Sequence, residues 1–351
     1  MQNPYTTLFG KIPSQIIPRA QQTALVTDTF MAPESNQQVY VVTGVRGAGK
    51  TVFMTDVSRM LAQDDRWIVE ELSVEQDLLQ SLVSKLNSKR HLAEFFTEAK
   101  IDLSFFGLGL RIQGAQPIAN IEVALERMLH TLARKNMRLL VAVDEVVNNV
   151  HVREFTSVFQ ILIRKDLPLY LLMTGLYENI RNLQDEKSLT FLYRAPKIRL
   201  EPLGIRSIAI NYRQTFHISQ ESALKMARLT NGYSFAFQLL GYLTWEQRGL
   251  TEETLDMYRS QLYELSYDKI WSELSPGDRR VAYGIASAAS ATVREIRASL
   301  GMESNQFSPY RRRLMDKGIV DGHERGKLTF TLPFFGEYTL ERYGETELYP
   351  A

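Results

Sequence analysis

The chain has 351 residues, of which 44% are hydrophobic and 23% are charged, an ordinary balance for a globular protein with a core of normal size. Its lack of cysteine excludes a disulfide framework, cysteine-ligated zinc and thiol catalysis. Because 41 basic residues stand against 40 acidic ones, the net charge of +1 creates no overall field for DNA or anionic membrane, so any nucleic-acid contact needs a local patch.

The apolar runs fall far short of the roughly 20 residues that span a bilayer, and residues 1–12 lack the basic and apolar regions of a signal peptide. We therefore expect a cytoplasmic protein with no membrane partner.

The first two hundred residues alternate short apolar runs with segments of helical period. This alternation predicts an α/β domain, in which helices cover both faces of a parallel sheet. The expected strands are Val39–Thr43, Trp67–Leu72, Leu139–Val143, Leu169–Thr174 and Lys197–Leu200. The expected helices between them include Lys50–Gln63, Asp77–Leu86, Ile121–Lys135 and Arg153–Arg164.

One segment interrupts this alternation. Residues 101–113 have strand-like flanks around a glycine-containing centre, which predicts a β-hairpin insertion. Its apolar side chains can pack against their own domain or dock on a partner, and we favour the former.

Helical patterns replace the strands after Pro202. The expected helices are Ile205–Phe216, Glu221–Leu229, Tyr233–Trp245 and Glu252–Tyr267, which form a small helical domain.

A further domain begins near Ser272. Ser275 before Pro276 is a helix N-cap signal, and Thr292 with Glu295 forms the pattern of a capping box. A third helix ends at Gly318, and two short strands follow. Three helices and a hairpin predict a winged helix. The resulting domains are 1–203, 204–271 and 272–351.

The chain contains the phosphate-loop pattern G-x-x-x-x-G-K-[ST], placed between an expected strand and an expected helix. Its glycines let backbone N–H groups turn toward phosphate oxygens, its lysine neutralises the β- and γ-phosphates of ATP, and its threonine hydroxyl supplies a ligand to Mg²⁺. The loop residues are Gly44, Val45, Arg46, Gly47, Ala48, Gly49, Lys50 and Thr51. We assign no catalytic role to Arg46.

Acidic residues follow the expected strand 139–143. Asp144 would lie near the Mg²⁺ ion, and Glu145 would polarise the attacking water. The alternative is a buried strand that merely ends in acids, and the phosphate loop argues against it.

Two further residues are candidates for catalysis. Thr174 ends the strand expected beside the phosphate-binding strand, where it can orient the water, touch the γ-phosphate or simply cap the strand. Arg194 precedes the last strand, where it can serve as a finger in cis or across a subunit interface, or form a surface ion pair.

Together these residues resemble AAA+ ATPases, and within them the origin-recognition and initiator branch and its prokaryotic relatives. The resemblance implies a RecA-like αβα sandwich, a helical lid and a C-terminal winged helix. The stretch Ile17-Pro-Arg-Ala-Gln-Gln22 is similar to the family's upstream box, which implies that Arg19 lies near the adenine and Thr174 is the first sensor.

The sequence departs from the family at the second sensor. The matching stretch, Asn231-Gly-Tyr-Ser-Phe-Ala-Phe-Gln238, lacks the arginine that the family often has there. This departure makes the sequence more similar to signal-transducing ATPases of the same superfamily, which often act as slow switches.

The winged helix carries basic residues that can contact DNA through phosphates and guanine edges. They are Arg311, Arg312, Arg313 and Lys317 on the third helix, and Arg325 and Lys327 on the hairpin, beside His323. Basic and acidic residues balance over residues 267–351, which leaves protein docking as the alternative.

The sequence therefore predicts a slow Mg²⁺-dependent ATPase whose winged helix is positioned according to whether ATP or ADP is bound. In one hypothesis, the winged helix binds double-stranded DNA. In the other, the protein is a nucleotide-gated signalling or assembly switch that self-associates or binds a protein partner.

Overall fold

The computed structural model describes residues 2–8, 13–108, 112–186 and 189–348. The chain divides into two compact units. We call the one made of Arg19–Thr43 and Lys50–Arg199 the sheet unit. The other, made of Met1–Pro18, Gly44–Gly49 and Leu200–Ala351, we call the helical unit. The predicted boundaries 1–203, 204–271 and 272–351 remain a prediction.

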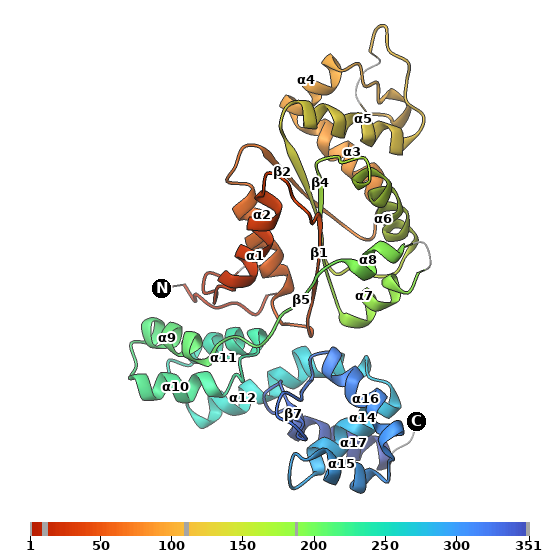
Figure 1. Ribbon diagram of the computed structural model, residues 1–351. Helices are drawn as coiled ribbons and strands as arrows, with labels where there is room; N and C mark the ends of the chain where they lie inside the picture. The colour runs from red at the N-terminus through yellow and green to blue at the C-terminus, as the bar shows by residue number, and fades with distance from the viewer. Residues whose placement is uncertain (1, 9–12, 109–111, 187–188, 349–351) are drawn as a thin grey trace. The chain divides into compact units, whose positions relative to one another are not determined.

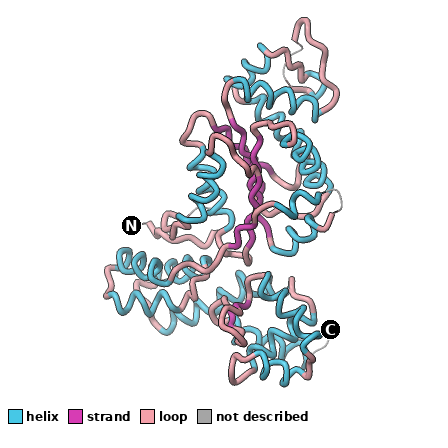
Figure 2. The backbone as a smooth tube through the Cα atoms, in the orientation of Figure 1, coloured by secondary structure: helices cyan, strands magenta, loops and turns pink. Residues whose placement is uncertain are grey.

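A five-stranded parallel sheet forms the centre of the sheet unit, as predicted (Figure 2). Its strands run in the order β2-β3-β4-β1-β5, which places β4 beside β1. Neighbouring strands pair in register at their carboxyl ends, where Thr43 pairs with Gly175 and Val143 with Met173. The residues that follow β1, β3 and β4 therefore meet at one edge. The strands are β1 (Val39–Thr43), β2 (Trp67–Leu72), β3 (Arg138–Val143), β4 (Leu169–Gly175) and β5 (Lys197–Arg199).

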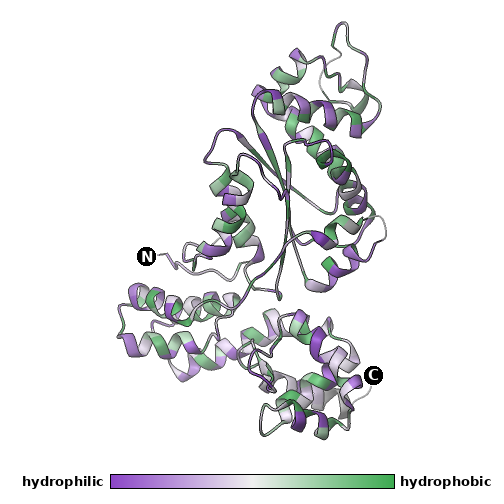
Figure 3. Ribbon diagram, in the orientation of Figure 1, coloured by the Kyte–Doolittle hydropathy of each residue, from purple (hydrophilic) through white to green (hydrophobic). Residues whose placement is uncertain are grey.

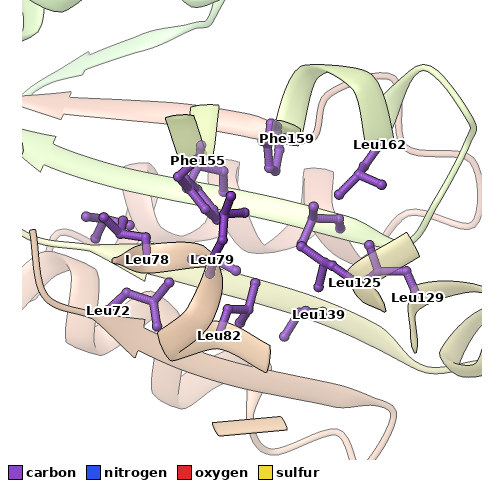
Figure 4. Packing of buried hydrophobic residues seen from close by; sticks show 14 of the residues in the cluster. Leu72, Leu78, Leu79, Leu82, Leu125, Leu129, Leu139, Phe155, Phe159 and Leu162 are labelled. Carbon is purple, nitrogen blue, oxygen red and sulfur yellow. The ribbon is translucent and has the colours of Figure 1, made fainter. Parts of the chain in front are cut away.

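Helices cover both faces of this sheet (Figure 1). On one face lie α1 (Ala20–Met31) and α2 (Lys50–Leu61). The opposite face is covered by α3 (Leu78–Ser88), α6 (Val150–Ile163), α7 (Tyr177–Gln184) and α8 (Thr190–Arg194), and α4 (Arg90–Glu98) and α5 (Ile121–Arg134) pack beside α3. Leucine and phenylalanine side chains from α3, α5 and α6 fill the core against β2 and β3 (Figure 4). Each such side chain contributes about 1.5–3 kcal/mol by burial.

The predicted β-hairpin at 101–113 is wrong for the residues that the structure describes; 109–111 lie outside them. Ser104–Phe106 forms a short 3₁₀ turn, η1, and Gly107 follows at φ +71°. The cause is Asp102, a fully buried residue whose carboxylate accepts hydrogen bonds from the N–H groups of Ser104 (2.9 Å) and Ile112 (3.1 Å). These bonds close a loop around the Asp102 carboxylate, in place of the backbone hydrogen bonds of a β-hairpin. Ile101 and Leu103 are buried in the core of the sheet unit, as the favoured interpretation expected.

Four helices open the C-terminal part of the helical unit, and they carry hydrophobic and hydrophilic residues around their circumference (Figure 3). They are α9 (Ile205–Phe216), α10 (Gln220–Arg228), α11 (Ser234–Glu246) and α12 (Glu252–Leu262), within two residues of the predicted bounds except at the end of α12. There the predicted single helix changes into a π-helical segment, η3 (Tyr263–Tyr267), followed by α13 (Asp268–Ser272).

The N-terminal segment packs on these helices. Tyr5 is 2% exposed, and its ring lies so close to Gly241 that a Cβ atom there would come within 2.6 Å of it. The Tyr5 hydroxyl donates to Asn211 Oδ1 (2.7 Å), and Gln238 Nε2 donates to the carbonyl of Gln15 (2.6 Å).

The winged helix forms as predicted, with one helix more. It contains α14 (Pro276–Ser287), α15 (Val293–Leu300), α16 (Ser304–Asp316), the antiparallel pair β6 (Val320–Asp321) and β7 (Thr329–Phe330), and the unpredicted α17 (Phe335–Leu348). Ser275 caps α14 in a capping box with Asp278. The predicted box at Thr292 is wrong, because Glu295 instead accepts hydrogen bonds from the N–H groups of Ala289 and Ser290.

Candidate phosphate-binding site

The phosphate loop follows β1 and ends at α2. The boundary between the two units passes through it, after Gly49, so its two parts are described in turn. In the helical unit, Gly47 (φ +75°) and Gly49 (φ +89°) take left-handed conformations, which side chains other than glycine rarely adopt. The Ala48 N–H donates to the Val45 carbonyl (3.1 Å) and closes the turn between them. Glycine is therefore required at positions 47 and 49 by the backbone that the structure shows.

Three consecutive carbonyls of the loop accept hydrogen bonds from the start of α11. The Tyr233 hydroxyl donates to the Arg46 carbonyl (2.7 Å), the Phe235 N–H to the Gly47 carbonyl (3.0 Å), and the Ser234 hydroxyl to the Ala48 carbonyl (2.9 Å). Because each peptide is planar, fixing a carbonyl also fixes the direction of the N–H across the same bond. The N–H groups of Gly47 and Gly49 are thereby directed away from α11.

These three residues belong to the stretch that lacks the second-sensor arginine. Gly232 (φ +76°) is needed before them because a Cβ atom there would come within 2.5 Å of the Leu203 carbonyl oxygen. Burial raises the pKa of Tyr233 well above its ordinary value, so its hydroxyl stays protonated and can donate. Sequence reasoning missed this role; the absent arginine was the only signal pointing to the stretch.

The Arg46 side chain also has a partner within the helical unit. Its Nη2 lies 3.1 Å from Glu273 Oε1, directly after α13. Sequence reasoning assigned Arg46 no such partner.

In the sheet unit, Asp144 lies between two hydroxyl groups. Thr51 Oγ1, in the first turn of α2, donates to Asp144 Oδ2 (2.6 Å), and Thr174 Oγ1, on β4, donates to Asp144 Oδ1 in a very short bond. The in-register ends of β3 and β4 place Asp144 and Thr174 side by side. Lys50, which precedes Thr51, is only 9% exposed. Four predicted site residues thus occupy consecutive or neighbouring positions at one edge of the sheet.

These residues fit a Mg²⁺ ion that is held with a nucleotide. Mg²⁺ takes oxygen ligands and is usually bound through one or two protein groups, water and phosphates. Thr51 and Asp144 offer a hydroxyl and a carboxylate 2.6 Å apart. Within the described ranges, no group of three or more His, Asp or Glu residues could hold a metal by itself.

Glu145 is exposed and has a left-handed backbone (φ +49°). Its N–H donates to Asp144 Oδ1 (3.0 Å). This conformation is rare for residues other than glycine, and it occurs here directly after β3, at a residue whose side chain is exposed.

The other two candidates lie at helix ends. Arg19 is the half-exposed N-cap residue of α1, where its side chain makes no capping bond. Arg194 is the exposed last residue of α8. Arg19 is predicted to contact an adenine base, and Arg194 is predicted to act as a finger in cis or across a subunit interface; both roles remain predictions.

The basic residues of the winged helix do not share one face, because three consecutive helical residues point about 100° apart. Arg313 Nε pairs with the buried Asp278 (2.8 Å), and Lys317 Nζ donates to the Glu273 carbonyl (3.3 Å). Arg311 is half-buried. Arg312 is 84% exposed in its side chain, near Asp316. On the wing, Arg325 and Lys327 are exposed, and Lys327 pairs with Glu324 (2.5 Å).

Solved structures share this fold over nearly the whole chain. The Walker-type ATPase PABY2304 of Pyrococcus abyssi matches with a TM-score of 0.64 and 14% identity, covering 93% of this chain and 96% of that one. The ORC2 protein of Aeropyrum pernix, solved as ADPNP-ADP complexes, matches with a TM-score of 0.59 and 15% identity, covering 97% and 96%. The predicted fold, a parallel sheet between helices followed by a helical region and a small C-terminal hairpin, is thereby confirmed.

Sequence comparisons reach only part of the chain. Residues 264–339 match a family described as a domain of unknown function (DUF8462), a segment that begins within η3 and ends within α17. No curated protein matches the chain. Within the described part of the chain, every helix is too short or too polar to span a membrane.

Proposed function

We propose that this protein binds ATP with Mg²⁺ and hydrolyses it slowly, and that its nucleotide state positions the winged helix on DNA. The observation that carries the nucleotide proposal is the Asp144 carboxylate held between Thr51 and Thr174. The motif residue expected to bind the metal, the acid expected beside it and the expected first sensor all meet there. The AAA+ fold and the nucleotide-bound state of the ORC2 neighbour support the same proposal.

Each residue has a distinct part in the proposed reaction. Lys50 would neutralise the β- and γ-phosphates, and the directed N–H groups of Gly47 and Gly49 would bind phosphate oxygens. Bound Mg²⁺, held by Thr51 and Asp144, would offset the charge that develops on the phosphates. Thr174 would orient the attacking water while Glu145 accepts its proton. Arg194 would contribute from a second copy, and Arg19 would contact the base.

Nucleotide binding is tested with a fluorescent ATP analogue and Mg²⁺. Wild-type protein should bind it, and Lys50→Ala should lower the affinity at least a hundredfold. Lys225→Ala is the matched control, because Lys225 is an exposed lysine whose ion pair with Glu221 lies on the surface of α10. Equal binding by wild type and Lys50→Ala would disprove the phosphate-loop assignment.

The DNA proposal rests on the polar and basic exposed residues of α16 and the wing. Asn305, Ser308 and Arg312 are exposed on α16, and Arg325 and Lys327 are exposed on the wing. These side chains can reach phosphates and base edges. Binding to random duplex DNA should be tighter with ATP and Mg²⁺ and should weaken steeply as salt rises.

A protein partner is the second candidate, and a specific observation favours it. Arg312, Arg313 and Lys327 each lie beside an acidic residue, so three of the basic residues predicted to contact DNA already have a partner of opposite charge. No DNA binding at low salt in either nucleotide state would support this alternative: a nucleotide-gated switch that binds a protein or another copy of itself.

A further inference from the structure

The contacts between the phosphate loop and α11 continue into the winged helix through buried groups of the helical unit. Tyr233 donates its only hydroxyl proton to the Arg46 carbonyl, so the Ser266 hydroxyl, 2.7 Å away, must donate to Tyr233. Ser266 is 3% exposed and lies within η3. The next residue, Tyr267, donates its hydroxyl to the Pro333 carbonyl (2.5 Å) between β7 and α17. One row of hydrogen bonds thus joins the loop to the winged helix.

A second connection runs through charged groups. Arg46 pairs with the Glu273 carboxylate (3.1 Å), and the Glu273 backbone carbonyl accepts a hydrogen bond from Lys317 at the end of α16 (3.3 Å). Both connections start at Arg46, one from its backbone and one from its side chain. They end at two points of the winged helix, before α17 and at the end of α16.

The peptide plane between Arg46 and Gly47 explains why these contacts can respond to phosphate binding at the loop. Its carbonyl faces Tyr233, and its N–H is one of those that would meet a phosphate oxygen. A phosphate that reorients the N–H must also move the oxygen on the other side, and with it the Tyr233–Ser266 pair. The receiving segment is a single π-helical turn, a feature that is frequent at functional sites.

We propose that Tyr233 and Arg46 are positioning residues that hold the phosphate loop ready for nucleotide and transmit its occupancy to the winged helix through η3 and α13. The proposal rests on the proposed nucleotide binding. Tyr233 and Arg46 would provide the link between lid and nucleotide that the missing second-sensor arginine otherwise supplies.

The test measures two quantities on the full chain. The first is affinity for ADP and for the fluorescent ATP analogue with Mg²⁺. The second is hydrogen exchange of the amides of residues 263–273 with and without nucleotide. In wild-type protein, nucleotide should slow exchange in this segment. Tyr233→Phe, which removes only the hydroxyl, should weaken nucleotide binding about tenfold and abolish the slowing.

Ser266→Ala separates positioning from transmission. It leaves the bond between Tyr233 and the Arg46 carbonyl intact, so nucleotide affinity should change less than threefold, whereas the slowing of exchange at 263–273 should be lost. Tyr242→Phe is the matched control on the same helix, because among the described residues its hydroxyl has no hydrogen-bond partner.

The ion pair is tested by exchanging its charges. Arg46→Glu should remove the nucleotide-dependent slowing, and Arg46→Glu combined with Glu273→Arg should restore at least half of it. The exposed Glu221–Lys225 pair, exchanged in the same way, is the control and should have no effect. Restoration would separate this role from a general loss of folding.

Two results would overturn the proposal. In the first, wild-type protein binds nucleotide but exchange at 263–273 does not slow. This result would contradict the transmission and would not affect the proposed ATP binding. The other is slowing that persists in both Tyr233→Phe and Arg46→Glu. Failure of wild-type protein to bind nucleotide would instead disprove the function on which the proposal depends.

Discussion

At the scale of single residues, Asp144 and Glu145 are neighbours in sequence with different surroundings. Asp144 is half-buried and accepts hydrogen bonds from both threonine hydroxyls. Glu145 projects to the surface from a left-handed backbone. The surroundings of Asp144 suit a carboxylate that is fixed in position to hold Mg²⁺. The exposed position of Glu145 suits a carboxylate that accepts a proton from a water molecule.

Glu145→Gln should therefore separate binding from turnover. The amide cannot accept a proton as the carboxylate does, so we expect ATP hydrolysis to fall by a factor of 10² or more, in the range typical of a lost general base, while ATP affinity stays within about threefold. Phosphate release and analogue binding measure the two effects. Glu154→Gln, at an exposed position on α6, is the control. Unchanged hydrolysis in Glu145→Gln would mean that another group activates the water.

Arg313 was predicted to contact DNA, but in the structure it pairs with the buried carboxylate of Asp278. Asp278 is 1% exposed; its Oδ2 accepts from the Ser275 hydroxyl (2.8 Å) and its Oδ1 from Arg313 Nε (2.8 Å). Removing Arg313 would leave a buried carboxylate without its cation. Since Arg313 is itself about one-third exposed, water would partly replace it.

We accordingly expect Arg313→Ala to lower the free energy of unfolding by about 2 kcal/mol. Chemical denaturation monitored by tryptophan fluorescence measures this. Arg312→Ala, at an exposed neighbouring position, should change it by less than about 0.5 kcal/mol. Equal effects of the two substitutions would show that the ion pair with Asp278 contributes nothing.

The sequence alone could identify the phosphate loop, Asp144 and Thr174, because fixed spacings and strand ends bring them together in this topology. It could not identify Tyr233, whose bond to the loop joins residues 187 positions apart. A hydroxyl that binds a backbone carbonyl leaves no motif, because the carbonyl is present at every residue.

At the scale of elements, the sequence correctly predicted the helices and strands that have a clear local pattern of residues. The three central strands, β1, β3 and β4, consist mostly of apolar residues, and α14 has a serine N-cap followed by proline. The hairpin at 101–113 was wrong because one buried carboxylate, that of Asp102, determines the loop. Helix α17 was missed because Pro333, Gly336 and Gly344 weaken its helical pattern, whereas the burial of Phe335 and Tyr338 stabilises it.

The winged helix also limits which residues can meet DNA. Arg312 is exposed on α16, whereas Arg313 and Lys317 are bonded to Asp278 and Glu273 within the helical unit. We expect Arg312→Ala to weaken DNA binding and to reduce the magnitude of the log–log salt slope by about 1, the value for one lost phosphate contact. Arg90→Ala, at a 94% exposed arginine on α4, should leave the slope unchanged. An unchanged slope in Arg312→Ala would exclude a phosphate contact by Arg312.

At the scale of the whole molecule, the helical unit is assembled from distant parts of the chain. Residues 2–8 pack beside helices that begin after residue 204. Gly241 makes this possible, because any side chain there would occupy the place of the Tyr5 ring.

Gly241→Ala should therefore displace the N-terminal segment. We expect a loss of about 2–3 kcal/mol, the burial energy of one large apolar side chain, and faster proteolysis within residues 2–18. Adding Tyr5→Ala to Gly241→Ala should cost little more, since the same contact is already lost. Gly249→Ala, at a position with open space around it, is the control. Strictly additive losses in the double variant would contradict the proposed displacement.

The placement of Tyr5 has a consequence for synthesis on the ribosome. Tyr5 bonds to Asn211, which is translated 206 residues later. At roughly 5–20 residues per second, the aromatic ring waits about 10–40 s for its partner. Over the same interval the whole sheet unit leaves the ribosome and can fold. The N-terminal segment is thus synthesised before the sheet and can dock only after the sheet has been synthesised, so its docking is a late step of folding rather than the start.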